Sequence, residues 1–392
     1  MFTEHQFGFR RGRSTLDAIL SFVEQTLKCF EGGEYSYSLF LDLAKAFDCV
    51  AHLILLGKLD AYGFSTDGCA LIASYLSNRY QMVYSNNNWS NKLNVSMGVP
   101  QGSVLGPVLF LIFINDLPSY LKIYKTILFA DDTTISVASK DLAAVLKEGA
   151  TAQSRAVEWF TSNELLANEQ KTVGLLFTLR NNVPTDKMGA ASFLGVSLDS
   201  SLRWDVCTDR LASKLTKNIF LLRSMSSRLS HNILRTAYFA IVESNLRYAL
   251  LAWGNCSSHA RIFALQRRAI RILASLPYRD DCKRAFIENK ILTFPCLYIL
   301  DSLVFAHNNR AAFIQNKDFH DYPTRSRDLI RNDYCRLTKS QRGPLYLSKK
   351  LYNKLPVTIK TLPLNRFKSI LKNFLLQYAF YDIEEFLTVI LV

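Results

Sequence analysis

The stretch "ILFADDTTI", residues 127–135, places two adjacent carboxylates between two runs of strand-forming residues. Apolar and β-branched residues on both sides of a short polar pair are typical of a β-hairpin, which we expect over 127–137. A pair of Asp residues in a tight turn also has a purely local explanation, because Asp side chains hydrogen-bond nearby backbone. Taken alone, the stretch predicts a hairpin and leaves the role of Asp131 and Asp132 open.

A second apolar strand ends on a carboxylate in the same way. The run "YSLFLDL" (37–43) reaches Asp42, and it follows a helix that apolar spacing predicts over 15–30. If both strands lie in one sheet, Asp42, Asp131 and Asp132 come close together, and like charges so placed need cations. Hard oxygen ligands without a thiolate cluster favour Mg²⁺ over Zn²⁺. The pattern therefore predicts phosphoryl transfer assisted by two divalent ions.

A Gly/Pro loop lies between these two strands in the sequence. In "GVPQGSVLGPVLF" (98–110), Gly98 and Gly102 allow the backbone to approach a ligand closely. Ser103 is placed to cap a buried helix over 103–117, whose N-terminus favours negative groups. The alternative is a plain turn that leads into a buried helix.

The remaining pattern indicates an α+β fold, because strands and helices interleave through the first half of the chain. Two short helices and a hairpin with an Asn-rich turn precede the loop, and a helix near 141–163 follows the Asp pair. Strands are predicted near 173–179 and 193–198, and weak boundaries near 181–192 and 321–344. Residues 205–275 are predicted to be helical, with Leu211, Leu215, Ile219 and Leu222 on one face, and a further helix is expected over 367–386.

The positive charge is concentrated in the rear of the chain. Of the net charge of +14 over 392 residues, 1–202 contribute −3 (16 Lys and Arg, 19 Asp and Glu), 203–290 contribute +10 (16 and 6) and 291–392 contribute +7 (15 and 8). An ordinary basic protein with solvated lysines would not explain this segregation. A polyanionic partner for the rear half would explain it.

Several function classes are disfavoured by composition. The eight cysteines lie at least 14 residues apart, which argues against a zinc knuckle and a dense disulfide framework. Apolar runs fall short of the ~20 residues of a membrane helix. The N-terminus lacks the apolar core of a signal peptide, so we expect an intracellular protein, in the nucleus or cytoplasm. No feature of the sequence indicates an oligomeric state.

Four motifs in one order carry a family resemblance: "QFGFRRGRST" (6–15), "FLDLAKAFD" (40–48), "GVPQGSVLGPVLFLIFINDLP" (98–118) and "LFADDT" (128–133). Together they closely resemble the reverse transcriptase of non-LTR retrotransposons of the LINE or jockey-like kind. The resemblance implies an RNA-directed DNA polymerase with a right-hand fold. It implies partial fingers and a palm in 1–202, a helical basic thumb in 203–290 and a basic C-terminal region of unassigned role in 291–392.

The resemblance also implies a catalytic set and its partners, which are an RNA template, a DNA primer and deoxynucleoside triphosphates. Asp42, Asp131 and Asp132, with the Leu43 carbonyl, would hold two Mg²⁺ or Mn²⁺ ions. Lys171 resembles the lysine that protonates the leaving pyrophosphate, a role for which the alternative is a solvated loop lysine.

Binding residues follow from the same resemblance. Phe47 would sit under the sugar of the incoming nucleotide and select deoxynucleotides, or it is simply a core residue. Arg10 would hold the triphosphate. The nucleotide pocket would be lined by Gly98, Pro100, Gln101 and Gly102. The turn at Phe193, Leu194 and Gly195 would grip the primer end, and an RNA/DNA duplex would lie on Lys214, Lys217, Arg223 and Arg228.

Relatives carry a longer fingers region and usually an endonuclease domain before the Gln6 motif, and we expect both to be absent from this chain. A second hypothesis is therefore a catalytically silent, truncated relic that only binds nucleic acid. A third, a metal-dependent nuclease, fits the acids but leaves Phe47 and the Gln101 loop unexplained.

Overall fold

The structure, a computed structural model, describes residues 2–180, 189–318 and 326–389. It contains two compact units: the first is Met1–Phe22 with Gly33–Leu194, and the second is Val23–Gly32 with Gly195–Val392. The boundaries predicted near 181–192 and 321–344 fall in part on 181–188 and 321–325, which lie outside the described residues.

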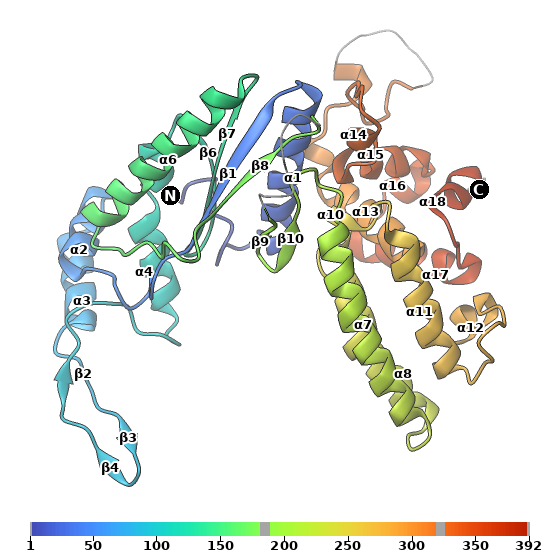
Figure 1. Ribbon diagram of the computed structural model, residues 1–392, viewed down its shortest axis with the longest axis horizontal. Helices are drawn as coiled ribbons and strands as arrows, with labels where there is room; N and C mark the ends of the chain where they lie inside the picture. Colours follow the sequence, from blue (N-terminus) through green and yellow to red (C-terminus); the bar gives the residue numbers. More distant parts are fainter. Residues whose placement is uncertain (1, 181–188, 319–325, 390–392) are drawn as a thin grey trace. The chain divides into compact units, whose positions relative to one another are not determined.

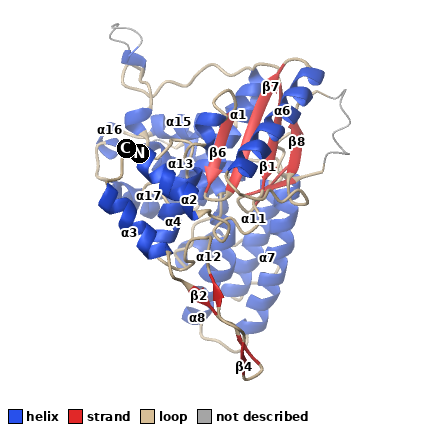
Figure 2. Ribbon diagram, turned by 90° about the vertical axis from the view of Figure 1, so that its left-hand side faces the viewer, coloured by secondary structure: helices blue, strands red, loops and turns tan. Residues whose placement is uncertain are grey.

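A four-stranded antiparallel sheet organises the first unit. Its order is β6 (Lys125–Phe129), β7 (Asp132–Ser139), β1 (Tyr35–Leu41) and β8 (Val173–Phe177). Figure 2 shows these strands in red. The hairpin predicted over 127–137 is confirmed as β6 and β7, and the predicted strand at 37–43 as β1.

Side chains of β1 alternate between the two faces of this sheet, as strand geometry requires. Phe40 packs on Phe22 of α1 (Thr15–Glu31), with ring centroids 5.6 Å apart. Leu39 and Leu41 point to the opposite face, where they join a core that includes buried residues of α6 (Leu142–Ser162). In Figure 1, α6 runs along the strands of the sheet. The sheet is therefore covered on both faces, and its polar strand ends are left for a site.

Helices and hairpins between β1 and β6 complete the first unit. The helix α4 (Leu105–Ile114) is buried along most of its length, as predicted for 103–117. The tip of the predicted hairpin is confirmed too, with Asn86 and Asn87 at φ +50° and +61°, the left-handed values that such a turn requires. The other elements are α2 (His52–Ala61), α3 (Thr66–Leu76), β2 (Tyr80–Gln81), β3 (Tyr84–Ser85), β4 (Asn88–Trp89), β5 (Leu93–Asn94), α5 (Leu117–Tyr120) and β9 (Ala191–Phe193).

The second unit is almost entirely helical in the residues that the structure describes. The long helix α7 (Asp205–Ser226) buries Leu215, Ile219 and Leu222, as predicted, and packs against α11 (His259–Leu273). The other elements before residue 290 are β10 (Val196–Leu198), α8 (His231–Tyr238), the π-helix η2 (Phe239–Glu243), α9 (Ser244–Arg247), α10 (Leu250–Trp253) and α12 (Lys283–Glu288).

The centre of the second unit is a helix that the sequence pattern did not predict. α13 (Phe294–Asn308) is apolar on nearly all sides and packs against α15 (Pro344–Lys354) and α17 (Leu364–Tyr378). A helix buried all round shows no amphipathic period, so periodicity could not detect it. The remaining elements are η3 (Arg310–Ala312), η4 (Asn316–Asp318), α14 (Thr338–Gln341), α16 (Val357–Lys360) and α18 (Ile383–Thr388).

The single helix predicted over 367–386 is wrong. α17 ends at Tyr378 because Ala379 adopts a left-handed conformation, φ +45°. α18 then begins separately, and the Asp382 side chain accepts a hydrogen bond from the Glu384 N–H at its start. The expected α+β class is confirmed as a mixed fold of helices and sheet. Among the described helices, none is both long and apolar enough to cross a membrane.

Candidate active site

Strand register brings the predicted carboxylates together at one edge of the sheet. β1 pairs with β7 so that Leu41 lies opposite Thr133, and the next pair along this antiparallel register is Asp42 and Asp132. Asp131 lies in the turn between β6 and β7. The sheet therefore places Asp42 beside the Asp131–Asp132 turn, as the strand ends predicted.

Two side chains from the loop after α6 contact Asp42. Its Oδ2 lies 3.3 Å from the Lys171 Nζ and 3.3 Å from the Asn168 Nδ2, which donates a hydrogen bond. The Asn168 N–H also donates to the Asp42 carbonyl at 2.8 Å. Leu43 forms an isolated bridge with Ala167. The two backbone hydrogen bonds of this bridge use the Ala44 N–H and the Asp42 carbonyl, so neither of them occupies the Leu43 carbonyl. The predicted Lys171 thus lies at the carboxylate cluster.

The three aspartates interact electrostatically. Burial raises the pKa of Asp132 to about 6, with further upward contributions from Asp131 and Asp42 and an opposing one from Lys171. The pKa of Asp131 is also raised, first by burial and then by the charge of Asp42. The cluster therefore holds more negative charge than Lys171 offsets. Within the described ranges, no three His, Cys, Asp or Glu side chains converge in an arrangement that would hold a metal ion.

Sequence reasoning missed the residue that holds the turn of the Asp pair. Gln6 is 1% exposed, and its Oε1 accepts hydrogen bonds from the N–H groups of Ala130 (3.0 Å) and Gly8 (2.8 Å). Ala130, immediately before Asp131, is left-handed with φ +54°, a conformation that costs a non-glycine residue energy. A Cβ on Gly8 would lie 2.5 Å from the Ala130 nitrogen, so only glycine fits there. The sign in the sequence that Gln6 has a role was its position at the start of the motif 6–15.

The loop at 98–102 folds onto the segment after Asp42. The N–H groups of Gly98 and Val99 donate to the carbonyls of Val50 and Phe47, each at 2.8 Å. Gly98 has φ +85°, and a Cβ there would lie 2.6 Å from the Asp48 carbonyl oxygen. Gln101 donates from Nε2 to the Asp48 Oδ1 at 2.8 Å. The loop that contains the predicted pocket residues is therefore bonded to residues 47–50.

Ser103 acts at the start of α4 as predicted, because its Oγ accepts from the Gly106 N–H at 2.9 Å and donates to the Pro100 carbonyl at 2.6 Å. Phe47 is half-buried, stacked on Phe110 with ring centroids 4.5 Å apart. Its position fits both of the roles considered for it, a wall of the pocket and a core contact.

Arg10 contacts residues of the N-terminal segment rather than the carboxylate cluster. Its guanidinium donates to the Thr3 carbonyl at 2.6 Å and lies 3.4 Å from the Glu4 carboxylate. None of the contacts found for Arg10 in the described part of the chain involves an aspartate of the cluster.

The predicted nucleic-acid contacts in the second unit are exposed. Lys214, Lys217 and Arg223 lie on the surface of α7, and Arg228 follows its end. Gly195 has φ +77°, and a Cβ there would lie 3.4 Å from the Tyr248 hydroxyl. Of the residues predicted to contact the primer end, Phe193 and Leu194 belong to the first unit and Gly195 to the second.

A groove between α7 and α11 contains arginines that sequence reasoning did not single out. Its volume is about 550 Å³, and Ala212 and Thr216 line it from α7. The buried Nε atoms of Arg267 and Arg268 have no hydrogen-bond partner within the described residues. An arginine-rich groove of this kind suits phosphate groups. Its arginines are Arg261, Arg267, Arg268, Arg271 and Arg279.

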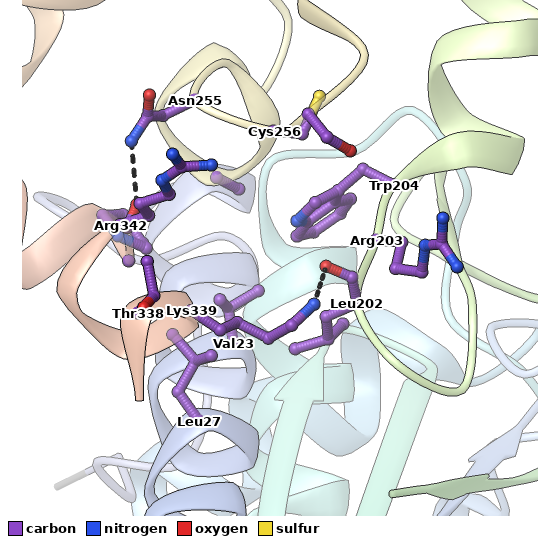
Figure 3. Close-up of a pocket in the computed structure, with 14 residues that line it drawn as sticks. Val23, Leu27, Leu202, Arg203, Trp204, Asn255, Cys256, Thr338, Lys339 and Arg342 are labelled. Atoms are coloured by element: carbon purple, nitrogen blue, oxygen red, sulfur yellow. Dashed lines mark hydrogen bonds between the residues drawn. The ribbon is translucent and has the colours of Figure 1, made fainter. Parts of the chain in front are cut away.

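The second unit also contains a smaller, open pocket of about 240 Å³ (Figure 3). The Trp204 indole forms one wall, and Arg342 lies on the side of Asn255. Lys339 donates from Nζ to the carbonyls of Ser201 (2.7 Å) and Leu202 (3.2 Å), and burial lowers the pKa of its ammonium group. These bonds tie α14 to the loop that leads into α7, which is a structural role.

The sequence is similar to known proteins over most of its length. The family model for reverse transcriptase (RNA-dependent DNA polymerase) matches residues 1–198. The probable RNA-directed DNA polymerase from transposon X-element of Drosophila melanogaster is 36% identical over 344 residues, which are 80% of this chain and 37% of that protein. The corresponding protein from transposon BS of the same organism is 31% identical over 70% of this chain and 33% of its own length.

The chain thus spans about a third of the length of these curated relatives. Among solved structures, apo telomerase from Candida tropicalis matches 73% of this chain and 50% of its own, with 13% identity and a TM-score of 0.42. Because the family model covers half of the residues, including all four motifs and the carboxylate cluster, the chain belongs to the reverse transcriptase family, in the jockey-like non-LTR retrotransposon group.

Proposed function

We propose that this chain is the core of an RNA-directed DNA polymerase that joins deoxynucleotides to the 3′-hydroxyl of a primer on an RNA template. The observation that carries the proposal is the strand register that ends with Leu41 opposite Thr133, so that Asp42 and Asp132 follow at the same edge of the sheet, together with the contact between Lys171 and Asp42. We assign the palm and partial fingers to 1–202, the thumb to 203–290 and a C-terminal region to 291–392.

Carboxylate oxygens are the ligands that Mg²⁺ and Mn²⁺ prefer. In the described residues the three carboxylates are not arranged as a metal site, so binding of the ions would require these side chains to turn toward one another. Asp42, Asp131 and Asp132 would supply carboxylate oxygens, and the Leu43 carbonyl, which accepts no backbone hydrogen bond from the described residues, would be a fourth ligand. The mutual repulsion that helps to raise the pKa of Asp132 is what a cation would relieve. Bound at these oxygens, the ions would stabilise charge on the attacking and leaving oxygens of phosphoryl transfer.

Lys171 is the proton donor in this proposal. Its side chain is 69% exposed, so it is open to a substrate, and its contact with Asp42 holds the ammonium group near the cluster. General acid catalysis contributes about 10²- to 10⁴-fold in rate. Lys171→Ala should therefore lower kcat by at least about 100-fold and leave the KM for primer nearly unchanged. If primer binding weakened as much as kcat fell, the result would contradict the role.

Phe47 is the sugar-selecting residue. Because Phe110 stacks on one side of its ring, the ring cannot retreat from a bulky substituent. Phe47→Ala should raise incorporation of ribonucleotides relative to deoxynucleotides, as read from single-nucleotide extension. An unchanged ratio would leave Phe47 as a core residue only.

The loop that holds Gly98, Pro100, Gln101 and Gly102 would form the wall of the nucleotide pocket beside Phe47. Arg10 would contact the triphosphate after release from Glu4. If both residues bind the nucleotide, Gln101→Ala and Arg10→Ala should each raise the KM for deoxynucleotides.

In the second unit, the arginine groove and the exposed cations of α7 would hold phosphates of the RNA/DNA duplex. By helical spacing, Arg223 lies two turns from Thr216 on the groove side of α7, whereas Lys214 lies on the other side. The turn at Gly195 would contact the primer end. Duplex affinity should fall steeply between low and moderate salt, because phosphate contacts release counterions.

The decisive experiment is primer extension on an RNA template with Mg²⁺ and deoxynucleotides. The chain should extend the primer, Asp131→Asn should abolish extension, and Asp141→Asn, which removes a carboxylate at the start of α6, should not. Extension that survives Asp131→Asn would refute the assignment.

One observation favours a second candidate, a catalytically silent nucleic-acid-binding protein. In the described residues no three acidic, His or Cys side chains converge as a metal site. Duplex binding with no extension in either Mg²⁺ or Mn²⁺ would establish this candidate instead.

A further inference from the structure

An exposed aromatic hairpin, residues 79–96, projects from the first unit beyond the end of α3 (Figure 1). β2 pairs with β5 and β3 pairs with β4, and in the described part of the chain no other strand borders either pair. Six large apolar side chains lie on this hairpin with half or more of their surface exposed. They are Tyr80 (53%), Met82 (50%), Val83 (65%), Tyr84 (54%), Trp89 (66%) and Leu93 (63%).

The rings are organised rather than scattered. Tyr84 and Trp89 are cross-strand partners, and their ring centroids lie 4.9 Å apart with the planes tilted by 44°. The Lys92 Nζ lies 4.0 Å from the centroid of the Tyr80 ring. The hairpin therefore offers a pair of ring faces and a separate cation held on a third ring.

The charge of this segment has one sign. Between Asp67 and Asp116 the sequence contains no Asp or Glu, and the only charged side chains of the hairpin are Arg79 and Lys92. Exposed rings together with cations and no carboxylates suit a ligand with flat apolar groups and negative charge. Single-stranded nucleic acid has this chemistry, because its bases stack on aromatic rings and its phosphates attract cations.

A duplex fits this surface less well, because its bases are already stacked on each other and only their edges face the grooves. The place of the hairpin in the chain also matters. Met97 follows the hairpin directly and bridges to Ala51, and Gly98 begins the loop beside Phe47. A strand held on the hairpin would thus be tethered close to that loop.

We propose that residues 79–96 form a binding platform for a single-stranded polynucleotide, with bases stacked on Tyr84 and Trp89 and phosphates drawn to Arg79 and Lys92. Binding at the platform needs neither metal ions nor nucleotides. It is therefore independent of the polymerase activity proposed above, and it can be tested with the full chain when extension fails.

The chain carries its own probe for this test. Of its four tryptophans, Trp159, Trp204 and Trp253 are 5%, 6% and 2% exposed, whereas Trp89 is 66% exposed. Quenching of the solvent-exposed tryptophan emission therefore reports on the hairpin. Titration with 20-nucleotide oligo(U) or oligo(dT), without divalent metal, should quench this emission saturably, and either oligonucleotide supports the proposal. Trp89→Phe should remove the quenched component, which identifies its source.

Base stacking on one ring contributes about 1–3 kcal/mol, which is roughly a 5- to 150-fold change in affinity. Tyr84→Ala, read through Trp89, should weaken binding by an amount in this range, and Lys92→Ala should weaken it and reduce its salt dependence. Tyr334→Ala removes an exposed ring of the second unit and should change nothing. Circular dichroism of each variant establishes that it is folded.

Inorganic polyphosphate, which has charge but no bases, separates stacking from simple charge attraction. It should compete weakly and leave the Trp89 emission unchanged. The proposal is overturned if neither oligonucleotide quenches Trp89 at low salt, if polyphosphate quenches it equally, or if Tyr84→Ala leaves the affinity unchanged.

Discussion

Gln6 is expected to hold the turn that carries Asp131, and Gln6→Met tests this directly. Met has nearly the shape of Gln but no strong acceptor, so the substitution leaves the buried N–H groups of Ala130 and Gly8 without their partner. An unsatisfied buried donor costs about 1–3 kcal/mol. The substitution creates two such donors and removes one, the buried Gln6 Nε2, which has no partner within the described residues. The net cost is therefore about 2 kcal/mol. Since Ala130 is already in a strained left-handed conformation, the turn should open more often.

Hydrogen exchange measured by mass spectrometry reads this opening locally. A cost of about 2 kcal/mol should accelerate exchange in peptides that cover 125–134 by roughly 30-fold. Peptides from α2 serve as the internal reference. Gln153→Met is the matched control, because Gln153 is an exposed residue of the same unit on α6.

A second substitution tests the cause. Ala130→Gly removes the cost of the left-handed conformation, about 1–2 kcal/mol, and should slow exchange in the wild-type background and recover part of the loss in Gln6→Met. Exchange in Gln6→Met that stays within threefold of wild type would refute the reasoning. So would a double variant that is no slower than Gln6→Met alone.

Three further changes probe buried charges. Burial raises the pKa of Glu24 above its ordinary value of 4.5. The protonated carboxyl therefore stabilises the folded state fully below pH 4.5, and this stabilisation is lost as the pH rises through the raised pKa. Glu24→Gln should raise the urea midpoint at pH 7 and not at pH 4. Burial also opposes ionisation of Glu31, but the neighbouring Ser340 and hydrogen bonds from the Leu337 and Arg336 N–H groups outweigh it and lower the pKa of this carboxyl. Glu31→Gln should therefore lower the urea midpoint at pH 7 and not below pH 4. The Lys58 ammonium donates to the Phe113 carbonyl and to Asp116, each at 2.7 Å, so Lys58→Met should destabilise the first unit by about 1–3 kcal/mol in thermal unfolding.

The carboxylate cluster shows what a one-dimensional pattern can predict. Asp42 and Asp132 each lie at the polar end of an apolar strand. The simplest arrangement of two such strands is side by side in one sheet, which brings their polar ends together. The structure adds the register, which brings the two residues to the same edge of the sheet directly after the pair Leu41–Thr133, and the loop contact between Lys171 and Asp42.

Other features depend on residues too far apart for any local pattern. Gln6 contacts the Ala130 backbone across 124 positions, and nothing near Gln6 indicates that partner. The arginine groove needs α7 and α11 side by side. α13 was missed for the opposite reason, because helices on several sides leave it no polar face to reveal its period.

The sequence by itself determined the family, the mixed fold and the identity of the acidic residues, because motif order, strand alternation and charge segregation are properties of the chain alone. Only the tertiary structure decided which groups meet. The strained Ala130 turn, the pKa of Asp132 and the exposed rings of the 79–96 hairpin arise from burial and from long-range hydrogen bonds, and these exist only once distant segments are packed.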